Sequence, residues 1–139
     1  MRNGEIVELE IPSSPEYVMI VRQAVEGIAK RMEFDVTQIE DLKVAVGEAC
    51  TNAVKYGCPR GDAHNVEVRC VVHQNGLEVQ IRNNIQGCER PRVPANPDLS
   101  REGGLGLYLI HELMDEVDIS WDKETAIVRM FKAITPNAA

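Results

Sequence analysis

The sequence predicts an α+β two-layer sandwich, in which one face of a single β-sheet is covered by helices. Three observations predict it. Apolar residues alternate at the start of the chain and through much of its second half, they recur at helical spacing in between, and the two patterns come in separate runs. The expected order is strand, two helices, hairpin, long loop, helix and hairpin. This order gives about five strands in a mixed, mostly antiparallel sheet with three helices.

The first half of the chain supplies one strand and two helices. Residues 5–11 alternate apolar and acidic side chains, which is typical of a half-buried strand. Ser14 followed by Pro15 predicts the start of a helix that runs to about residue 33. Thr37–Glu40 has the pattern of a capping box, and the apolar stripe after it predicts a second helix that ends near Tyr56.

The second half changes to a strand period. The turn Gln74-Asn75-Gly76 predicts a tight hairpin between two strands, and a closing hairpin is expected around residues 122–124. Between them, periodicity is lost over a proline-containing stretch, for which we expect a lid at about 85–103, followed by a helix over 104–114. We expect one domain over residues 1–139, with a loose tail at 135–139.

Composition excludes several classes of function. The 139 residues contain 15 Lys plus Arg and 22 Asp plus Glu, a net charge of −7, so a direct nucleic-acid partner is not expected. No apolar run is long enough for a bilayer, and no secretory signal is visible at the start, which predicts a cytoplasmic protein without a membrane partner. The four cysteines and three histidines lack ligand spacing, so zinc is not expected.

The first candidate site lies on the second helix. Glu48 and Asn52 are one helical turn apart in a stretch of small residues, with Lys55 three residues further on. A solvated helix face would explain them, although such a face is usually richer in charge, and Gly47 is costly inside a helix. Alternatively, the carboxylate and carboxamide hold a hydrated Mg²⁺, or the carboxylate acts as a general base.

The second candidate is the glycine-rich run Glu102–Leu107 at the start of the third helix. Glycines there let backbone N–H groups approach an anion, which the helix N-terminus also favours. A tight turn explains the same glycines. Arg101, at the end of the expected lid, either pairs with a phosphoryl group or is an ordinary surface arginine.

The two candidates, in this order, carry a family resemblance. The runs EYVMIVRQAV, IEDLKVAVGEACTNAVKY and REGGLGLYLIHELMDEV resemble the GHKL ATPases, and among them the bacterial anti-sigma-factor serine kinases of partner-switching systems of the general-stress type. The resemblance implies a Bergerat-type fold that binds ATP and Mg²⁺ between helices and sheet. It also implies phosphorylation of a serine on a small anti-anti-sigma protein, sequestration of a sigma factor, and a homodimer.

The resemblance also implies roles for residues. Glu48 matches the catalytic base, Asn52 the Mg²⁺ ligand, and Arg22 an arginine that contacts protein partners. The nucleotide-binding residues that it implies are Asn52, Lys55, Asn83, Gly87, Arg101, Gly103, Gly104, Leu105, Gly106 and Leu107.

The chain departs from the family where adenine is recognised. The family pattern is Asp-x-Gly after the third strand, whereas this chain has Asn83 and Ile85, and Phe131 stands where a threonine is usual on the last strand. Asn83 retains an acceptor oxygen but not a charged one. One or two lost polar contacts would weaken ATP binding by tenfold to several thousandfold, at about 1–3 kcal/mol each.

Two functions therefore compete. The favoured one is an ATP-dependent serine kinase that also binds a sigma factor; the alternative is a sequestering module on the same fold that has lost nucleotide dependence. A third, the catalytic half of a sensor histidine kinase, is disfavoured because such chains carry a phosphoacceptor-histidine hairpin ahead of a domain that here begins at about residue 5.

Overall fold

The computed structural model describes residues 1–56, 65–84, 104–122 and 124–134, which form five strands, three α-helices and one 3-10 turn. The predicted lid and tail lie outside the described residues. In chain order the elements are β1 (Ile6–Pro12), η1 (Pro15–Tyr17), α1 (Val18–Arg31), α2 (Val36–Tyr56), β2 (Asn65–His73), β3 (Gly76–Asn84), α3 (Gly104–Leu113), β4 (Glu116–Trp121) and β5 (Thr125–Ala133).

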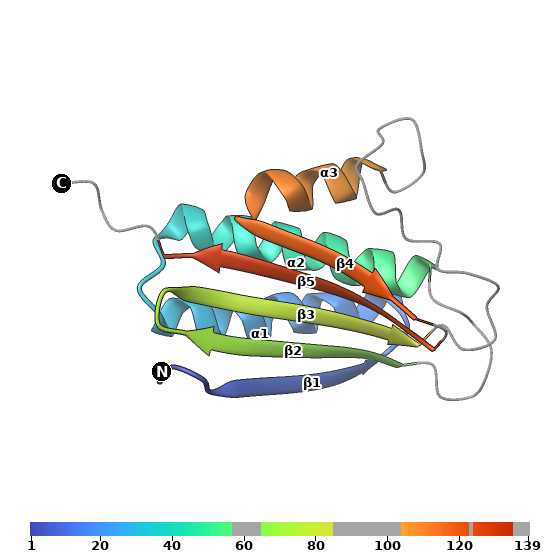
Figure 1. The fold of residues 1–139 in the computed structure, drawn as a ribbon, viewed down its shortest axis with the longest axis horizontal. Helices are drawn as coiled ribbons and strands as arrows, with labels where there is room; N and C mark the ends of the chain where they lie inside the picture. Colours follow the sequence, from blue (N-terminus) through green and yellow to red (C-terminus); the bar gives the residue numbers. More distant parts are fainter. Residues whose placement is uncertain (57–64, 85–103, 123, 135–139) are drawn as a thin grey trace.

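The five strands form one sheet in the order β1-β2-β3-β5-β4. Every neighbouring pair is antiparallel, so the expected parallel pairing of a mixed sheet is wrong. The three helices lie together on one face of the sheet, and α2 contacts both α1 and α3 (Figure 1). The predicted two-layer α+β sandwich is confirmed, and no helix of the described residues lies on the opposite face of the sheet.

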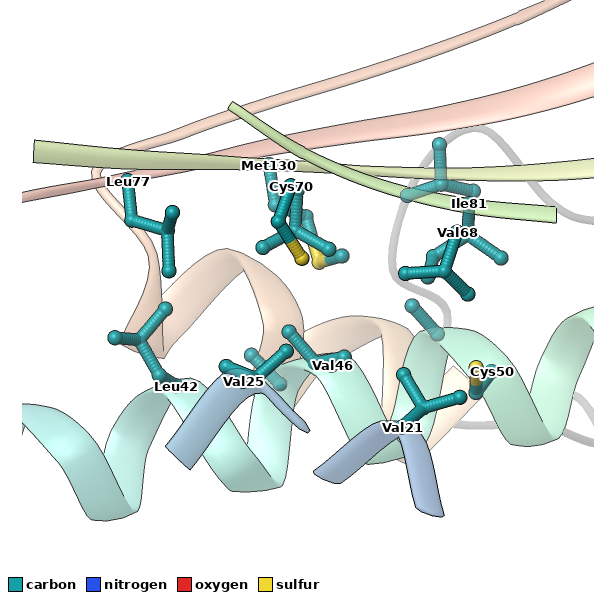
Figure 2. Close-up of a cluster of buried hydrophobic side chains, with 14 of the residues drawn as sticks. Val21, Val25, Leu42, Val46, Cys50, Val68, Cys70, Leu77, Ile81 and Met130 are labelled. Atoms are coloured by element: carbon teal, nitrogen blue, oxygen red, sulfur yellow. The ribbon is translucent and has the colours of Figure 1, made fainter. Parts of the chain in front are cut away.

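The core lies between the helices and the sheet. Alternate residues of β2 are buried, as the period of two requires when only one face is covered. Leu42 and Val46 of α2 point toward Leu77 and Cys70 of the sheet, and Val21 of α1 points toward Val68 (Figure 2). Each of these side chains is fully buried, so they provide the apolar burial that holds the layers together.

The two N-terminal helices begin differently from the sequence prediction. Pro15 starts a 3-10 turn rather than α1, and the Ser14 side chain makes no capping hydrogen bond. The capping box before α2 lies two residues earlier than predicted: Asp35 Oδ1 accepts the Gln38 N–H at 2.8 Å, and Gln38 Oε1 accepts the Asp35 N–H at 3.2 Å. Gln38 also donates to the carbonyl of Ala133 on β5 at 3.2 Å, and this contact with the sheet favours the earlier box.

The β2–β3 hairpin is present, but Gly76 has another role than the predicted turn. His73 pairs with Gly76, so the two turn residues are Gln74 and Asn75, and neither has the positive φ of an Asn-Gly type I′ turn. A Cβ atom at position 76 would lie 2.2 Å from the carbonyl oxygen of Lys132. Glycine is therefore required there because β5 passes so close.

Lys132 joins β5 to the helix layer. Its Nζ donates to the carbonyl of Leu113 at the end of α3, at 2.6 Å, and lies 3.7 Å from the Asp41 carboxylate of α2. A cation at a helix C-terminus interacts favourably with the last carbonyl groups. The contact fixes the end of α3, and with it the direction in which that helix leaves the candidate site.

No helix in the described part of the chain is long and apolar enough to cross a membrane.

Candidate functional site

Glu48 and Gly106 meet where α2 packs against α3. A Cβ atom at position 106 would lie 2.6 Å from Oε2 of Glu48 and 3.8 Å from its Cβ, so the carboxylate occupies space that any other residue would fill. Gly106 lies in the first turn of α3, which begins at Gly104. The two sequence candidates thus form one site, with a partly exposed carboxylate beside a helix N-terminus.

Asn52 follows Glu48 by one turn, and it contradicts the interpretation of this segment as an ordinary solvated face. Its side chain is only 6% exposed, and its carboxamide makes no hydrogen bond to any other residue that the structure describes. Lys55 is exposed in the last turn of α2. The α2 surface toward α3 therefore presents a carboxylate and an unengaged carboxamide, both of which are oxygen donors of the kind that Mg²⁺ prefers.

Asn83, at the end of β3, contributes a buried acceptor. It is 3% exposed, and its Nδ2 donates to the carbonyl of Ala53 in α2 at 2.9 Å. Because a carbonyl only accepts, this bond fixes the orientation of the amide, and Oδ1 is left without a partner in the structure. An unsatisfied buried oxygen is costly, and such groups mark functional positions.

The contact with Ala53 gives Asn83 a role that the aspartate of the family pattern could not fill when ionised. Ala53 is among the last four residues of α2, whose carbonyls have no partner within the helix. Asn83 provides a donor to that carbonyl, which an ionised aspartate lacks. Sequence reasoning missed this role, because no local signal connects position 83 with position 53.

Several predicted site residues lie outside the described part of the chain: Ile85, Gly87, Arg101 and Gly103. For Gly104 and Leu105 the structure describes the backbone start of α3 only. Leu107 is 1% exposed and belongs to the apolar core. The described part of the site therefore consists of Glu48, Asn52, Asn83 and Gly106, with Lys55 at its border.

Phe131 does not belong to this site. Val128 and Met130 are in the apolar core beneath the helices, so Phe131, next along β5, lies on the opposite face. There its ring meets that of His73 edge to face, with the centroids 6.0 Å apart. The expectation that Phe131 replaces a threonine beside adenine is wrong, because this alternation turns the side chain to the opposite face of the sheet.

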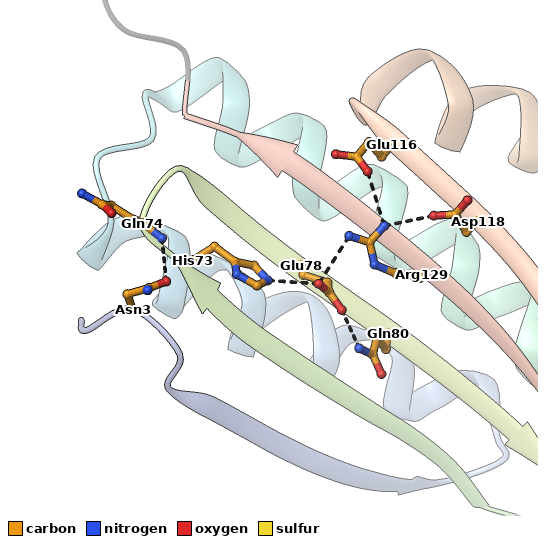
Figure 3. A network of polar contacts seen from close by, with 8 residues as sticks. All are labelled: Asn3, His73, Gln74, Glu78, Gln80, Glu116, Asp118 and Arg129. Carbon is orange, nitrogen blue, oxygen red and sulfur yellow. Dashed lines mark hydrogen bonds and ion pairs between the residues drawn. The ribbon is translucent and has the colours of Figure 1, made fainter.

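The helix-free face of the sheet carries a polar cluster centred on Glu78 (Figure 3). Burial opposes ionisation of Glu78, but hydrogen bonds from Gln80 and His73 and the charge of Arg129 outweigh it and lower the pKa of the carboxyl. His73 Nε2 lies 3.0 Å and Arg129 Nη2 3.4 Å from Glu78 Oε1. Arg129 also pairs with Asp118 at 3.0 Å. These pairs hold four strands together, on the face of the sheet opposite the helices.

The described cysteines are structural. Cys50 and Cys70 are both buried and free, and burial raises the pKa of each thiol to about 12. A thiol with so high a pKa is a poor nucleophile and metal ligand at neutral pH. Within the described residues no three His, Cys, Asp or Glu side chains gather to hold a metal.

A family model matches this architecture and this site. Residues 11–132 match the model described as the histidine kinase-like ATPase domain. The match covers most of the chain, including α2, β3 and α3. The chain therefore belongs to the histidine kinase-like ATPase family.

The relatives narrow the class. The chain is 39% identical over 126 residues to the serine-protein kinase RsbW of Bacillus subtilis (strain 168), covering 84% of this chain and 79% of that protein. It is 35% identical over 131 residues to RsbW of Listeria monocytogenes serotype 4a, covering 88% of this chain and 83% of that one. Within its family, the chain belongs with the serine-protein kinases of the anti-sigma, partner-switching type.

Solved structures share the fold. The RsbU and RsbW domains of Rv1364c from Mycobacterium tuberculosis match with a TM-score of 0.72 and 13% identity, over 96% of this chain and 34% of that one. The SiaB–SiaC complex of Pseudomonas aeruginosa matches with a TM-score of 0.68 and 14% identity, over 90% of this chain and 88% of that one. At these identities the likeness concerns the fold alone.

Proposed function

We propose that this chain, acting in the cytoplasm, transfers the γ-phosphoryl group of ATP to a serine of a small anti-anti-sigma protein and sequesters a sigma factor when that protein is unavailable. The observation that carries the proposal is the meeting of Glu48 with Gly106 at the start of α3, one turn from the buried carboxamide of Asn52. The proposal includes a homodimer, one domain over residues 1–139 and a lid at about 85–103.

Glu48 is the general base of the proposed transfer. Its carboxylate accepts the proton of the serine hydroxyl as the serine oxygen bonds to the γ-phosphorus and the bond to the β-phosphate oxygen breaks. Gly106 leaves room for the carboxylate to stay at the helix junction. In such transfers the protein contributes mainly position and electrostatic stabilisation, so the rate depends on where the two carboxylate oxygens of Glu48 are placed.

Asn52 is the residue that would hold Mg²⁺. Its buried carboxamide makes no hydrogen bond to another described residue, and Mg²⁺ usually takes one or two protein oxygens and completes its shell with water and phosphate. When bound, the ion neutralises charge on the phosphates. This matters in a chain of net charge −7, where we propose that Lys55, Arg101 and the backbone of Gly103–Leu107 attract the remaining phosphate charge.

Asn83 is the residue that would recognise the base, with Gly87 close by in the same proposed pocket. Its Oδ1 is a buried acceptor with no partner among the described residues, as the amino group of adenine requires. The amide cannot turn to offer a donor without breaking its bond to Ala53. Phe131 lies on the other face of the sheet and no longer bears on adenine binding. The changes at Asn83 and Ile85 still favour the alternative function, a module that sequesters a sigma factor without nucleotide.

Titration calorimetry with the full chain tests this function. We expect Mg-ATP to bind with measurable heat and Mg-GTP to bind at least tenfold more weakly, because guanine presents a carbonyl oxygen where adenine has an amino group. Absence of heat and of a thermal shift at millimolar Mg-ATP would remove the kinase function and leave the sequestering module. Equal binding of the two nucleotides would contradict the role of Asn83.

A second prediction concerns Asn83 alone. Asn83→Asp, which restores the family residue, should destabilise the nucleotide-free chain by about 1–3 kcal/mol at neutral pH, because a carboxylate offers no donor to the Ala53 carbonyl. Burial should raise the pKa of the new carboxyl in the folded chain. The lost stability should therefore return as the pH falls toward 4, where the protonated group can donate.

Urea unfolding at pH 7 and pH 4.5, compared between the variant and the wild type, measures this difference. Asn3→Asp provides a control, since Asn3 is exposed and its Oδ1 accepts the Gln74 N–H at 2.9 Å, which a carboxylate oxygen can also do. A destabilisation by Asn83→Asp that does not diminish toward pH 4.5 would contradict the capping role.

A further inference from the structure

The Arg22 side chain of α1 lies across α2 at Gly47. A Cβ atom at position 47 would be 3.0 Å from Cδ of Arg22 and 3.4 Å from both Cγ and Nε. Gly47 is buried although its neighbours Val44 and Glu48 are partly exposed, as expected if the arginine stem covers it. Glycine, which is unfavourable inside a helix, therefore stands at the point of α2 that the Arg22 side chain crosses.

The head of this arginine is not used within the described chain. Arg22 is exposed, and its guanidinium makes no ion pair or hydrogen bond with the residues in 1–56, 65–84, 104–122 and 124–134. Other cations on the same helix are engaged: Lys30 pairs with Glu26 at 2.9 Å, and Arg31 donates to the Gly27 carbonyl at 3.2 Å. Ion pairs and hydrogen bonds with the described residues therefore do not explain the position of Arg22.

The position of Arg22 relative to Glu48 suggests what it serves. Glu48 follows Gly47 directly, and it points toward α3 while Gly47 faces α1, so the carboxylate and the arginine stem flank one turn of α2. A protein substrate that brings a serine to Glu48 must pass close to Arg22. An exposed guanidinium at such a place suits a carboxylate or a main-chain carbonyl of the docked protein.

We propose that Gly47 is a positioning residue for protein-substrate binding, because its missing side chain lets Arg22 lie over α2 beside the catalytic carboxylate. The proposal rests on the proposed kinase function and adds a residue to it. It predicts that stability and substrate binding respond in opposite directions at position 47. Alanine there should raise the midpoint of thermal unfolding by up to about 3 °C through helix propensity, while moving the arginine away from the substrate.

The chain contains a matched control. Gly27 lies in α1, one and a half turns after Arg22, and a Cβ atom there would meet nothing within 4 Å. Gly27→Ala should therefore give a similar rise in thermal stability without touching Arg22. A difference in substrate binding between Gly27→Ala and Gly47→Ala isolates the contact with the arginine from the general effect of replacing a helical glycine.

The experiment measures phosphotransfer from Mg-ATP to a purified, unphosphorylated anti-anti-sigma protein that carries an acceptor serine. We expect Gly47→Ala to raise KM for this anti-anti-sigma protein severalfold and Gly47→Leu about tenfold, approaching the effect of Arg22→Ala, while kcat and KM for ATP stay within twofold of wild type. In the Arg22→Ala background, Gly47→Ala should add less than twofold, because the group that it displaces is gone.

The outcomes separate this inference from the function on which it rests. A wild-type chain that transfers no phosphate overturns the proposed function, and the positioning role with it. A wild-type chain that transfers phosphate, with Gly47→Ala and Gly47→Leu as good as Gly27→Ala, overturns the positioning role only. Additive effects of Gly47→Ala and Arg22→Ala would likewise overturn it, since each residue would then act alone.

Discussion

Glu48→Gln should reduce phosphotransfer by at least a hundredfold, and up to about ten-thousandfold, while leaving Mg-ATP binding and partner capture largely intact. Glutamine has nearly the same shape, so the packing against Gly106 is kept. What it loses is the ability to accept the serine proton. The effect should therefore fall on kcat, because the interaction that is removed belongs to the transition state rather than to bound substrate.

Single-turnover transfer with saturating Mg-ATP measures this loss directly. Glu40→Gln is the control: Glu40 is an exposed glutamate of the same helix, and its ion pair with Lys43, at 3.3 Å, lies two turns from the site. It should retain wild-type activity. If Glu48→Gln keeps more than a third of the wild-type rate, Glu48 is not the base and another group must take the proton.

Sequence patterns predicted the elements of the fold because their signals are local. The alternation in β2 and the apolar stripe of α2 each determine which face is buried, and both faces are buried as expected. Two capping boxes are possible before α2, and a contact with the sheet favours the earlier one. Gln38 is in the capping box that also reaches β5, and Glu40 in the predicted box pairs with Lys43 instead.

The site was predictable to the extent that it follows helix periodicity. Glu48 and Asn52 share a helix, so their common placement follows from a spacing of four residues. The contacts between elements were not predictable in the same way. Nothing near Asn83 in sequence indicates that Ala53 will need a donor, and nothing near Gly106 indicates that Glu48 will fill the missing side chain.

Phe131 shows how a resemblance fails when strand parity is ignored. One residue of slippage along a strand moves a side chain to the opposite face. Aligned by motif, Phe131 belonged beside adenine; placed by the register of β5 with Glu78 of β3, it belongs with the polar cluster on the helix-free face. Val128 and Met130 are both buried in the core beneath the helices, two residues apart. Phe131 follows Met130 directly, so its side chain points to the other face.

Gly106→Ala should lower phosphotransfer without lowering the stability of the fold. The added methyl would lie 2.6 Å from Glu48 Oε2, the mobile end of a flexible side chain, so the carboxylate can move away without unfolding α3. Alanine also favours the helix by up to about 1 kcal/mol. We expect stability to be unchanged or slightly higher, and phosphotransfer to fall about a hundredfold, as displacement of a catalytic group by about 1 Å can produce.

Urea unfolding and phosphotransfer on the same preparation measure the two effects, with Gly27→Ala as the control for a helical glycine with open space around it. The double variant with Glu48→Gln distinguishes the two roles of Gly106. If the glycine acts by making room for the base, Gly106→Ala should cost little more once the base is gone, and Mg-ATP affinity should be kept. If it acts through the phosphates, affinity should fall in both backgrounds, and the carboxylate would then have to be held at the helix junction by other contacts.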